Sequence, residues 1–173
     1  NYPILIDQEG GRVDRLNKFI DSSMFKPSFF GNLYTKDIKK FEIFYKIFID
    51  RTSRLLNKIG VNINTLPLLD IRRLKSNNII GDRSYGDNLK VVSAIGDFCI
   101  KNFHNNKIGT IMKHIPGHGL AKVDSHLFTP IVKESFLSLS KLDFAAFKNK
   151  ECLMAITAHI IYQNIDKKNT ATH

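Results

Sequence analysis

The stretch KHIPGHGLAKVDSH, from Lys113 to His126, contains three histidines and an aspartate as well as Lys113 itself. Histidine titrates near neutral pH, so it can accept or donate a proton under working conditions. Pro116 and Gly117 interrupt any helix, so the histidines cannot share a helical face as they do in an H-E-x-x-H zinc site. The stretch therefore predicts a loop that carries proton-transferring groups.

The end of this stretch, DSH, places Asp124 two residues before His126. In an extended or turned backbone, the carboxylate can hold the imidazole, fix its tautomer and raise its proton affinity. We interpret the two residues as a general acid/base pair. No G-x-S-x-G motif accompanies them, so a serine hydrolase is not indicated. Two alternatives stay open: a zinc site made from the loop by His114, His118 and His126, or loop histidines that only satisfy backbone hydrogen bonds.

The elements that position this loop alternate along the chain. Four apolar segments predict buried strands: Pro3–Asp7, the start of Val61–Asp70 up to Pro67, Ile108–His114 and Cys152–His159. Three segments with helical spacing of apolar residues lie between them: Ile38–Ile59, about Leu89–His104, and Leu137–Phe147. A polar loop, Gly81–Asp87, precedes the second of these helices.

Apolar strands that alternate with helices indicate an α/β fold with a parallel sheet. Each predicted strand ends in polar residues, namely Asp7, Asp70, Lys113 with His114, and His159. Active sites of β/α barrels are built at these strand ends. A barrel takes about 250 residues, so we expect a partial (β/α)8 TIM barrel with about four parallel strands. Residues 1–173 then form a single incomplete catalytic domain, with an N-terminal strand and a C-terminal part outside the chain.

Composition narrows the class of protein. The net charge is +10, but the lysines are scattered rather than gathered with aromatic residues, so we expect no nucleic-acid partner. No apolar run reaches the roughly 20 residues that span a bilayer, and no signal segment opens the chain. Cys99 and Cys152 fit no disulfide or metal spacing and are expected to be reduced core thiols. Reduced thiols favour a cytoplasmic location, and the short apolar runs predict no membrane partner.

Four motifs occur in an order and spacing that resemble one family. They are DQEGGRVDR (Asp7–Arg15), GDRSYGD, KHIPGHG followed by DSH, and AITAHIIYQNID (Ala155–Asp166). Together they resemble the bacterial β-N-acetylhexosaminidases of glycoside hydrolase family 3, which remove terminal N-acetylglucosamine from muropeptides during cell-wall recycling. The resemblance covers essentially the whole chain.

The resemblance implies roles for particular residues. It places His126 as the acid/base and Asp124 as its partner. It also implies five substrate-binding residues: Asp7, Arg15, Arg83, Lys113 and His114. From the residues alone, Asp7 could instead cap a helix or pair with Arg12, the arginines could form surface salt bridges, and Lys113 could pair with a carboxylate of a neighbouring strand. Asp70 and His159 could line the pocket or support it from behind.

The resemblance further implies a retaining reaction through a covalent glycosyl-enzyme, with no metal and no cofactor. The partner is a small sugar substrate, an N-acetylglucosamine-anhydromuramyl muropeptide, and the protein is a monomer. The family's nucleophilic aspartate follows the next strand, so this chain is expected to be an internal fragment that lacks it and is inactive alone. A His–Asp pair in place of the usual second carboxyl group gives the site one fewer fixed negative charge. Phosphate would meet less repulsion there, so a phosphorylase that uses phosphate in place of water stays open.

Overall fold

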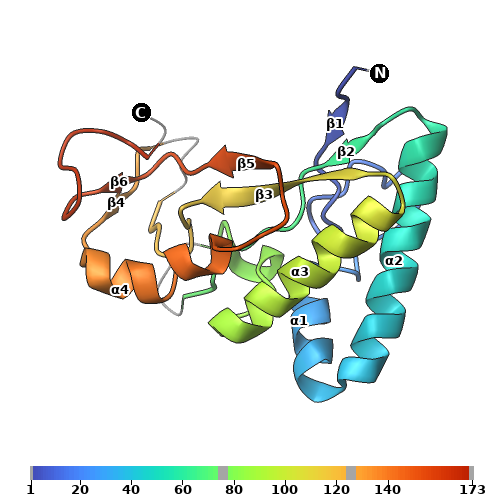
Figure 1. The fold of residues 1–173 in the computed structure, drawn as a ribbon, viewed down its shortest axis with the longest axis horizontal. Coiled ribbons are helices and arrows are strands. Elements are labelled where there is room, and N and C mark those ends of the chain that lie inside the picture. The colour runs from blue at the N-terminus through green and yellow to red at the C-terminus, as the bar shows by residue number, and fades with distance from the viewer. Residues whose placement is uncertain (1, 74–77, 124–127, 172–173) are drawn as a thin grey trace.

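The computed structural model of the 173-residue chain describes residues 2–73, 78–123 and 128–171 (Figure 1). Its main sheet has four parallel strands in the order β1-β2-β3-β5. These strands are β1 (Leu5–Ile6), β2 (Ile63–Asn64), β3 (Gly109–Ile115) and β5 (Met154–Thr157). All four lie within or beside the predicted strand segments, and the parallel arrangement confirms the predicted sheet.

Three helices cover one face of this sheet: α1 (Pro27–Lys36), α2 (Ile38–Lys58) and α3 (Leu89–Asn105) (Figure 1). The helices α2 and α3 match the two predicted helices to within one residue at each end. Each begins at a capping side chain: the carboxylate of Asp37 accepts a hydrogen bond from the backbone N–H of Lys40, and Asn88 caps α3 in the same way. The sequence analysis did not predict α1, a helix that starts at Pro27.

The main hydrophobic core fills the space between these helices and the sheet. Its centre is a cluster of aromatic rings in which Phe30, Phe41 and Tyr45 are each about 1% exposed. The Tyr45 and Tyr85 hydroxyls lie 2.6 Å apart, so the polar end of each buried ring has a hydrogen-bond partner. This core attaches the loop that contains Tyr85 to α1 and α2.

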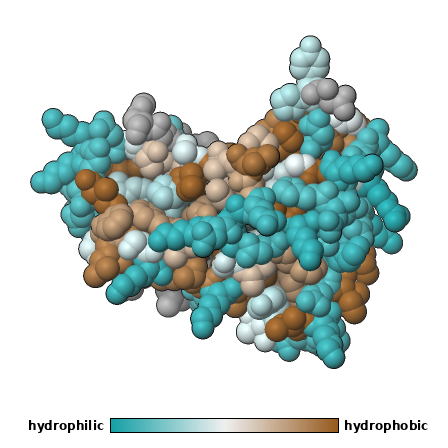
Figure 2. Space-filling view, viewed as in Figure 1, coloured by the Kyte–Doolittle hydropathy of each residue, from teal (hydrophilic) through white to brown (hydrophobic). Residues whose placement is uncertain are grey.

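The opposite face of the sheet is open along its outer strands. Leu5 of β1 is 49% exposed, and Met154 and Ile156 of β5 are 40% and 37% exposed. Figure 2 shows hydrophobic surface on the side of the molecule where β5 lies. An open apolar face is what the inner side of an incomplete barrel presents, because its inward side chains have no facing strands.

The segments after β3 and β5 form a small second unit. The strands β4 (Ile131–Val132) and β6 (Ile161–Tyr162) pair in parallel, and α4 (Phe136–Lys141) packs beside them. Buried residues of this unit form a separate cluster: Ala121, Val132, Leu139, Ala158, Ile160 and Tyr162. No helix in the described ranges is long and apolar enough to cross a membrane.

The prediction of one helix over Leu137–Phe147 was wrong. The structure has α4 and then a separate 3-10 turn, η2 (Phe144–Phe147). Leu142 between them leaves the helical region with φ −132° and ψ −76°. The break turns the buried carboxylate of Asp143 onto Arg73, with 2.6 Å between Oδ2 and Nη2. A pattern of apolar spacing could not foresee this, because Arg73 is distant in sequence.

Candidate active site

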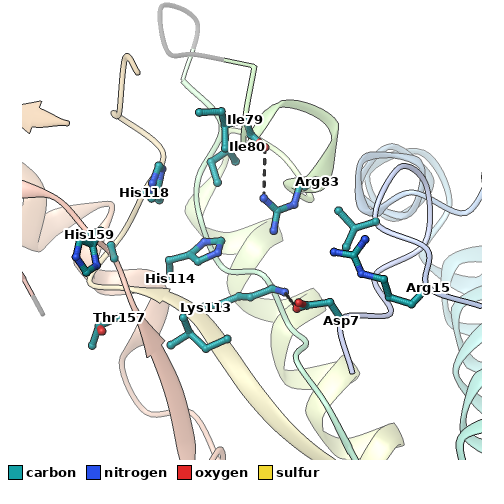
Figure 3. A pocket seen from close by; sticks show the side chains of 13 residues that line it. Asp7, Arg15, Ile79, Ile80, Arg83, Lys113, His114, His118, Thr157 and His159 are labelled. Atoms are coloured by element: carbon teal, nitrogen blue, oxygen red, sulfur yellow. Dashed lines mark hydrogen bonds and ion pairs between the residues drawn. The ribbon is translucent and has the colours of Figure 1, made fainter. Parts of the chain in front are cut away.

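A pocket of about 500 Å³ opens at the carboxyl ends of the strands (Figure 3). Its polar lining comes from the end of each strand or the loop after it: Asp7 and Arg15 after β1, Arg83 after β2, Lys113 and His114 in β3 with His118 after it, and Thr157 in β5 with His159 after it. All five predicted substrate-binding residues therefore line one pocket. They converge because the carboxyl ends of parallel strands lie on the same side of a sheet.

Lys113 and Asp7 form the floor of this pocket. Lys113 Nζ lies 2.8 Å from Asp7 Oδ1 and 2.9 Å from the hydroxyl of Thr65, which itself hydrogen-bonds to Asp7. Burial alone would raise the pKa of Asp7, but the hydrogen bonds from Lys113 and Thr65 outweigh it and lower that pKa. Asp7 Oδ2 has no hydrogen-bond partner among the described residues, and the side chain is 45% exposed. A fixed carboxylate with one open oxygen can accept hydrogen bonds from hydroxyl groups.

Glu9 connects the two principal cations of the pocket, and the sequence reading missed it. Its carboxylate is fully buried and accepts hydrogen bonds from both Nε and Nη2 of Arg83, each at 2.8 Å. Its Oε1 also lies 2.6 Å from Lys113 Nζ. Burial alone would raise the pKa of Glu9, yet the interactions with Arg83 and Lys113 lower it. The sequence feature that could have pointed to Glu9 is its position two residues after Asp7, the aspartate at the end of a predicted strand.

This network decides what each cation can offer to a ligand. All three N–H groups of Lys113 have protein acceptors, namely Asp7, Thr65 and Glu9. Lys113 therefore holds the carboxylates in place, and a direct bond to a ligand would have to replace one of these. Arg83 uses three of its five N–H groups on Glu9 and the carbonyl of Ile79, so donors remain for a ligand.

Asp70 lies behind the pocket and supports it. Its fully buried carboxylate contacts the Nδ1 atom of His114 at 2.7 Å. It also accepts the backbone N–H groups of His114 and His118, at 3.2 and 2.6 Å. Burial alone would raise the pKa of Asp70, but the interaction with His114 and the hydrogen bond from His118 lower it. Of the two roles left open for Asp70, the structure supports the one behind the pocket.

Two further histidines lie on the side of the pocket nearer β5 (Figure 3). His118 is 4% exposed, and burial is the main reason that its pKa lies below the ordinary value. His159 is exposed and lies two residues after the end of β5. It lines the pocket, which is one of the two possibilities predicted.

Arg15 reaches the pocket from a tight turn after β1. Gly10 and Gly11 make this turn with φ +83° and +63°, and a Cβ at Gly10 would lie 2.4 Å from the carbonyl oxygen of Phe25. Only glycine fits this backbone. The Arg15 guanidinium forms no ion pair with any described residue, whereas Arg12 pairs with Asp82 outside the pocket. The alternative pairing of Asp7 with Arg12 is therefore not the one found.

The proposed acid/base pair, Asp124 and His126, lies outside the described residues. The zinc hypothesis also needs His126, so it is not tested. Within residues 2–73, 78–123 and 128–171, no group of three or more His, Cys, Asp or Glu side chains is arranged to hold a metal ion.

Comparison with known proteins places this pocket in a family context. Residues 3–173 match the family model described as the glycosyl hydrolase family 3 N terminal domain. Beta-hexosaminidase A of Pseudoalteromonas piscicida is 33% identical over 167 residues, which cover 94% of this chain and 27% of that protein. A beta-hexosaminidase of Xanthomonas campestris is 27% identical over 165 residues, with 94% and 49% covered.

Solved structures agree with the sequence comparison. NagZ from Neisseria gonorrhoeae in complex with N-trifluoroacetyl-D-glucosamine superposes with a TM-score of 0.86 at 27% identity, covering 96% of this chain and 50% of that one. A family 3 beta-N-acetylglucosaminidase from Paenibacillus gives 0.82 at 28% identity, covering 99% and 32%. The partial TIM-barrel fold is thereby confirmed. The chain spans half or less of the length of these relatives.

Proposed function

The chain belongs to glycosyl hydrolase family 3, and from this premise we propose that the whole protein removes terminal β-linked N-acetylglucosamine with retention of configuration. Relatives that carry the name beta-hexosaminidase support this activity. The observation that carries it is the open oxygen of Asp7, held beside Arg83 and His114 at the strand ends of a fold that in NagZ binds an N-acylated glucosamine.

The pocket residues divide the work of binding a sugar. Asp7 accepts hydrogen bonds from hydroxyl groups through Oδ2, and Lys113 keeps its carboxylate in place. Arg83 donates from the N–H groups that Glu9 leaves open, and His114 offers its Nε2 atom. Arg15 lines the pocket and is exposed. Its guanidinium, which forms no ion pair with the described residues, suits an acidic muramyl portion of the substrate.

The reaction proceeds in two steps. A carboxylate attacks the anomeric carbon while His126, oriented by Asp124, protonates the oxygen of the leaving group. His126 then takes a proton from the water that displaces the carboxylate from the sugar. We assign no residue of this chain as the nucleophile and place that carboxylate in the remainder of the whole protein.

The natural substrate that we propose is an N-acetylglucosamine-anhydromuramyl muropeptide, processed in the cytoplasm by a monomer during cell-wall recycling. A phosphorylase is the alternative within the same family. The two reactions share the glycosyl-enzyme and differ only in the acceptor, so the product distinguishes them: free sugar from water, or a sugar phosphate from phosphate.

The test uses the whole protein and nitrophenyl glycosides. We expect cleavage of the β-N-acetylglucosaminide and little cleavage of the β-glucoside, with free N-acetylglucosamine as the product even in phosphate buffer. Absence of cleavage of the N-acetylglucosaminide, and of the muropeptide itself, would reject the proposed function. A sugar phosphate as the main product would establish the alternative.

The variant His126→Ala tests the acid/base assignment. Nitrophenolate is a good leaving group that needs little protonation, so we expect a rapid burst followed by turnover slowed about 10²–10⁴-fold, because breakdown of the glycosyl-enzyme lacks its base. The control is His104→Ala, an exposed histidine of α3 that does not line the pocket. A His126→Ala enzyme that turns over like the wild type would disprove the assignment.

A further inference from the structure

We propose that Asp70 is a positioning residue of the pocket: it keeps a hydrogen on the Nδ1 atom of His114, so that Nε2 faces the ligand as an acceptor for a hydroxyl group. The effect of this arrangement on catalysis rests on the proposed function. The hydrogen position itself does not, because it follows from contacts within the protein.

Three donors converge on the Asp70 carboxylate. Its Oδ2 atom faces both the backbone N–H of His114, at 3.2 Å, and the ring atom Nδ1, at 2.7 Å. Its Oδ1 atom accepts the backbone N–H of His118 at 2.6 Å. The side chain is 0% exposed, so no solvent competes for these bonds. Because an ionised carboxylate only accepts hydrogen bonds, the ring nitrogen that contacts it must carry the hydrogen.

The backbone holds Asp70 opposite His114. Leu68 pairs with Lys113 in a parallel bridge, and the N–H of Leu69 donates to the carbonyl of Lys113 at 2.8 Å. On the other side, the hydroxyl of Ser84 donates to the carbonyl of Asp70 at 2.6 Å. Asp70 therefore connects the end of β3 to the loop that carries Arg83.

The ring of His114 extends from β3 toward the pocket, between Lys113 and His118 (Figure 3). Its side chain is 20% exposed, so its contact with solvent is on the pocket side. In the neutral ring, a hydrogen on Nδ1 makes Nε2 an acceptor. The pocket then presents acceptors at Asp7 and His114 and donors at Arg83, a pattern that matches the donor and acceptor character of adjacent sugar hydroxyls.

An amide cannot replace this carboxylate without loss. In Asp70→Asn, the amide oxygen can face His118 or His114, and the NH₂ group then faces a donor at the other position. With the NH₂ group toward His114, the ring must move its hydrogen to Nε2. Nε2 then becomes a donor and no longer accepts a hydrogen bond from the ligand.

The first test is ¹⁵N NMR of the histidine rings in the whole protein, with His114→Gln used to assign the signal. We expect the Nδ1–H form in the wild type and a shift toward Nε2–H in Asp70→Asn and Asp70→Ala. The matched control is Asp143→Asn, since Asp143 is also a buried carboxylate but pairs with Arg73. It should leave the signal of His114 unchanged. A wild-type ring with hydrogen on Nε2, or the same form in both Asp70 variants, would refute the proposal.

The second test is a double-mutant cycle measured by kcat/KM on the nitrophenyl N-acetylglucosaminide. We expect Asp70→Asn and His114→Gln each to lower kcat/KM about 10–100-fold, and the double variant to be no worse than His114→Gln, because Asp70 acts through His114. If the losses of kcat/KM from the two single substitutions multiply in a correctly folded double variant, Asp70 does not act through His114. If the wild type shows no activity, the proposed function fails, while the NMR result still decides the role of Asp70.

Discussion

At the scale of the residue, buried carboxylates organise the pocket. Glu9 neutralises Arg83 and Lys113, and Asp70 orients His114, while Asp7 keeps one oxygen open. Removing one partner of a buried ion pair leaves an uncompensated charge, which costs far more than the loss of a surface pair. Stability and the proposed ligand binding therefore depend on the same side chains here.

Glu9→Gln removes the charge that two cations share. We expect the free energy of unfolding of the whole protein to fall by about 3 kcal/mol, because Arg83 and Lys113 keep their charge without full compensation. Activity should fall as well, since Arg83 loses its two-point support. Urea unfolding measures the loss. The control is Glu42→Gln on the exposed face of α2, expected to change stability by less than about 0.5 kcal/mol. Equal effects of the two substitutions would contradict the role given to Glu9.

At the scale of the element, α1 fixes the loop that carries Arg83. Gly31 of α1 packs directly on the backbone of Tyr85: a Cβ at Gly31 would lie 1.5 Å from the carbonyl oxygen of Tyr85. The Tyr85 ring in turn lies in the main core, where its hydroxyl meets that of Tyr45. The position of Arg83 therefore depends on the close approach of this helix.

Gly31→Ala tests this dependence. Alanine favours a helix over glycine by about 1 kcal/mol, so propensity alone predicts a more stable protein. We expect the opposite, a loss of about 1–3 kcal/mol with a lower kcat/KM, because the loop must move away from α1. The control is Gly86→Ala, where a Cβ would meet nothing within 4 Å. A gain of stability in Gly31→Ala would show that the loop adapts freely.

At the scale of the whole molecule, the perturbed groups set the dependence of stability on pH. The pKa of His118 is lowered, mainly by burial, so the unfolded chain takes up a proton near pH 6.5 before the folded one does. Stability is then lost as the pH falls below about 6.5. The lowered pKa values of Asp7, Glu9 and Asp70 add a second loss below about pH 4.5. Asp143, whose pKa burial raises, acts in the opposite direction at acid pH.

Comparison of urea midpoints at pH 7.5 and 5.5 isolates the first of these effects. We expect a lower midpoint at pH 5.5 in the whole protein, because the pKa values of Asp7, Glu9 and Asp70 are lowered, whereas burial opposes protonation of His118 in the fold. In His118→Gln, this difference should become smaller. A difference that is unchanged in the variant would assign the pH dependence to other groups.

The sequence by itself determined the alternation of strands and helices and the edge at which the site forms. The spacing of apolar residues predicted the ends of β3, α2 and α3 to within one residue. This works because an element that buries one face must repeat apolar residues along its own stretch of sequence. The strand-end positions of Asp7, Lys113 and His114 were enough to bring them together, because parallel strands end on the same side. The motifs supplied Arg15 and Arg83.

Only the tertiary structure decided which partners these side chains have. Glu9 and Arg83 are 74 residues apart, and Asp70 and His114 are 44 apart. Such pairings depend on the order and register of the strands, which no local pattern specifies. The same holds for the break at Leu142, where Asp143 turns toward Arg73. Local sequence sets which groups reach the edge of the sheet, whereas packing between distant segments sets the charge and the hydrogen position that each group presents there.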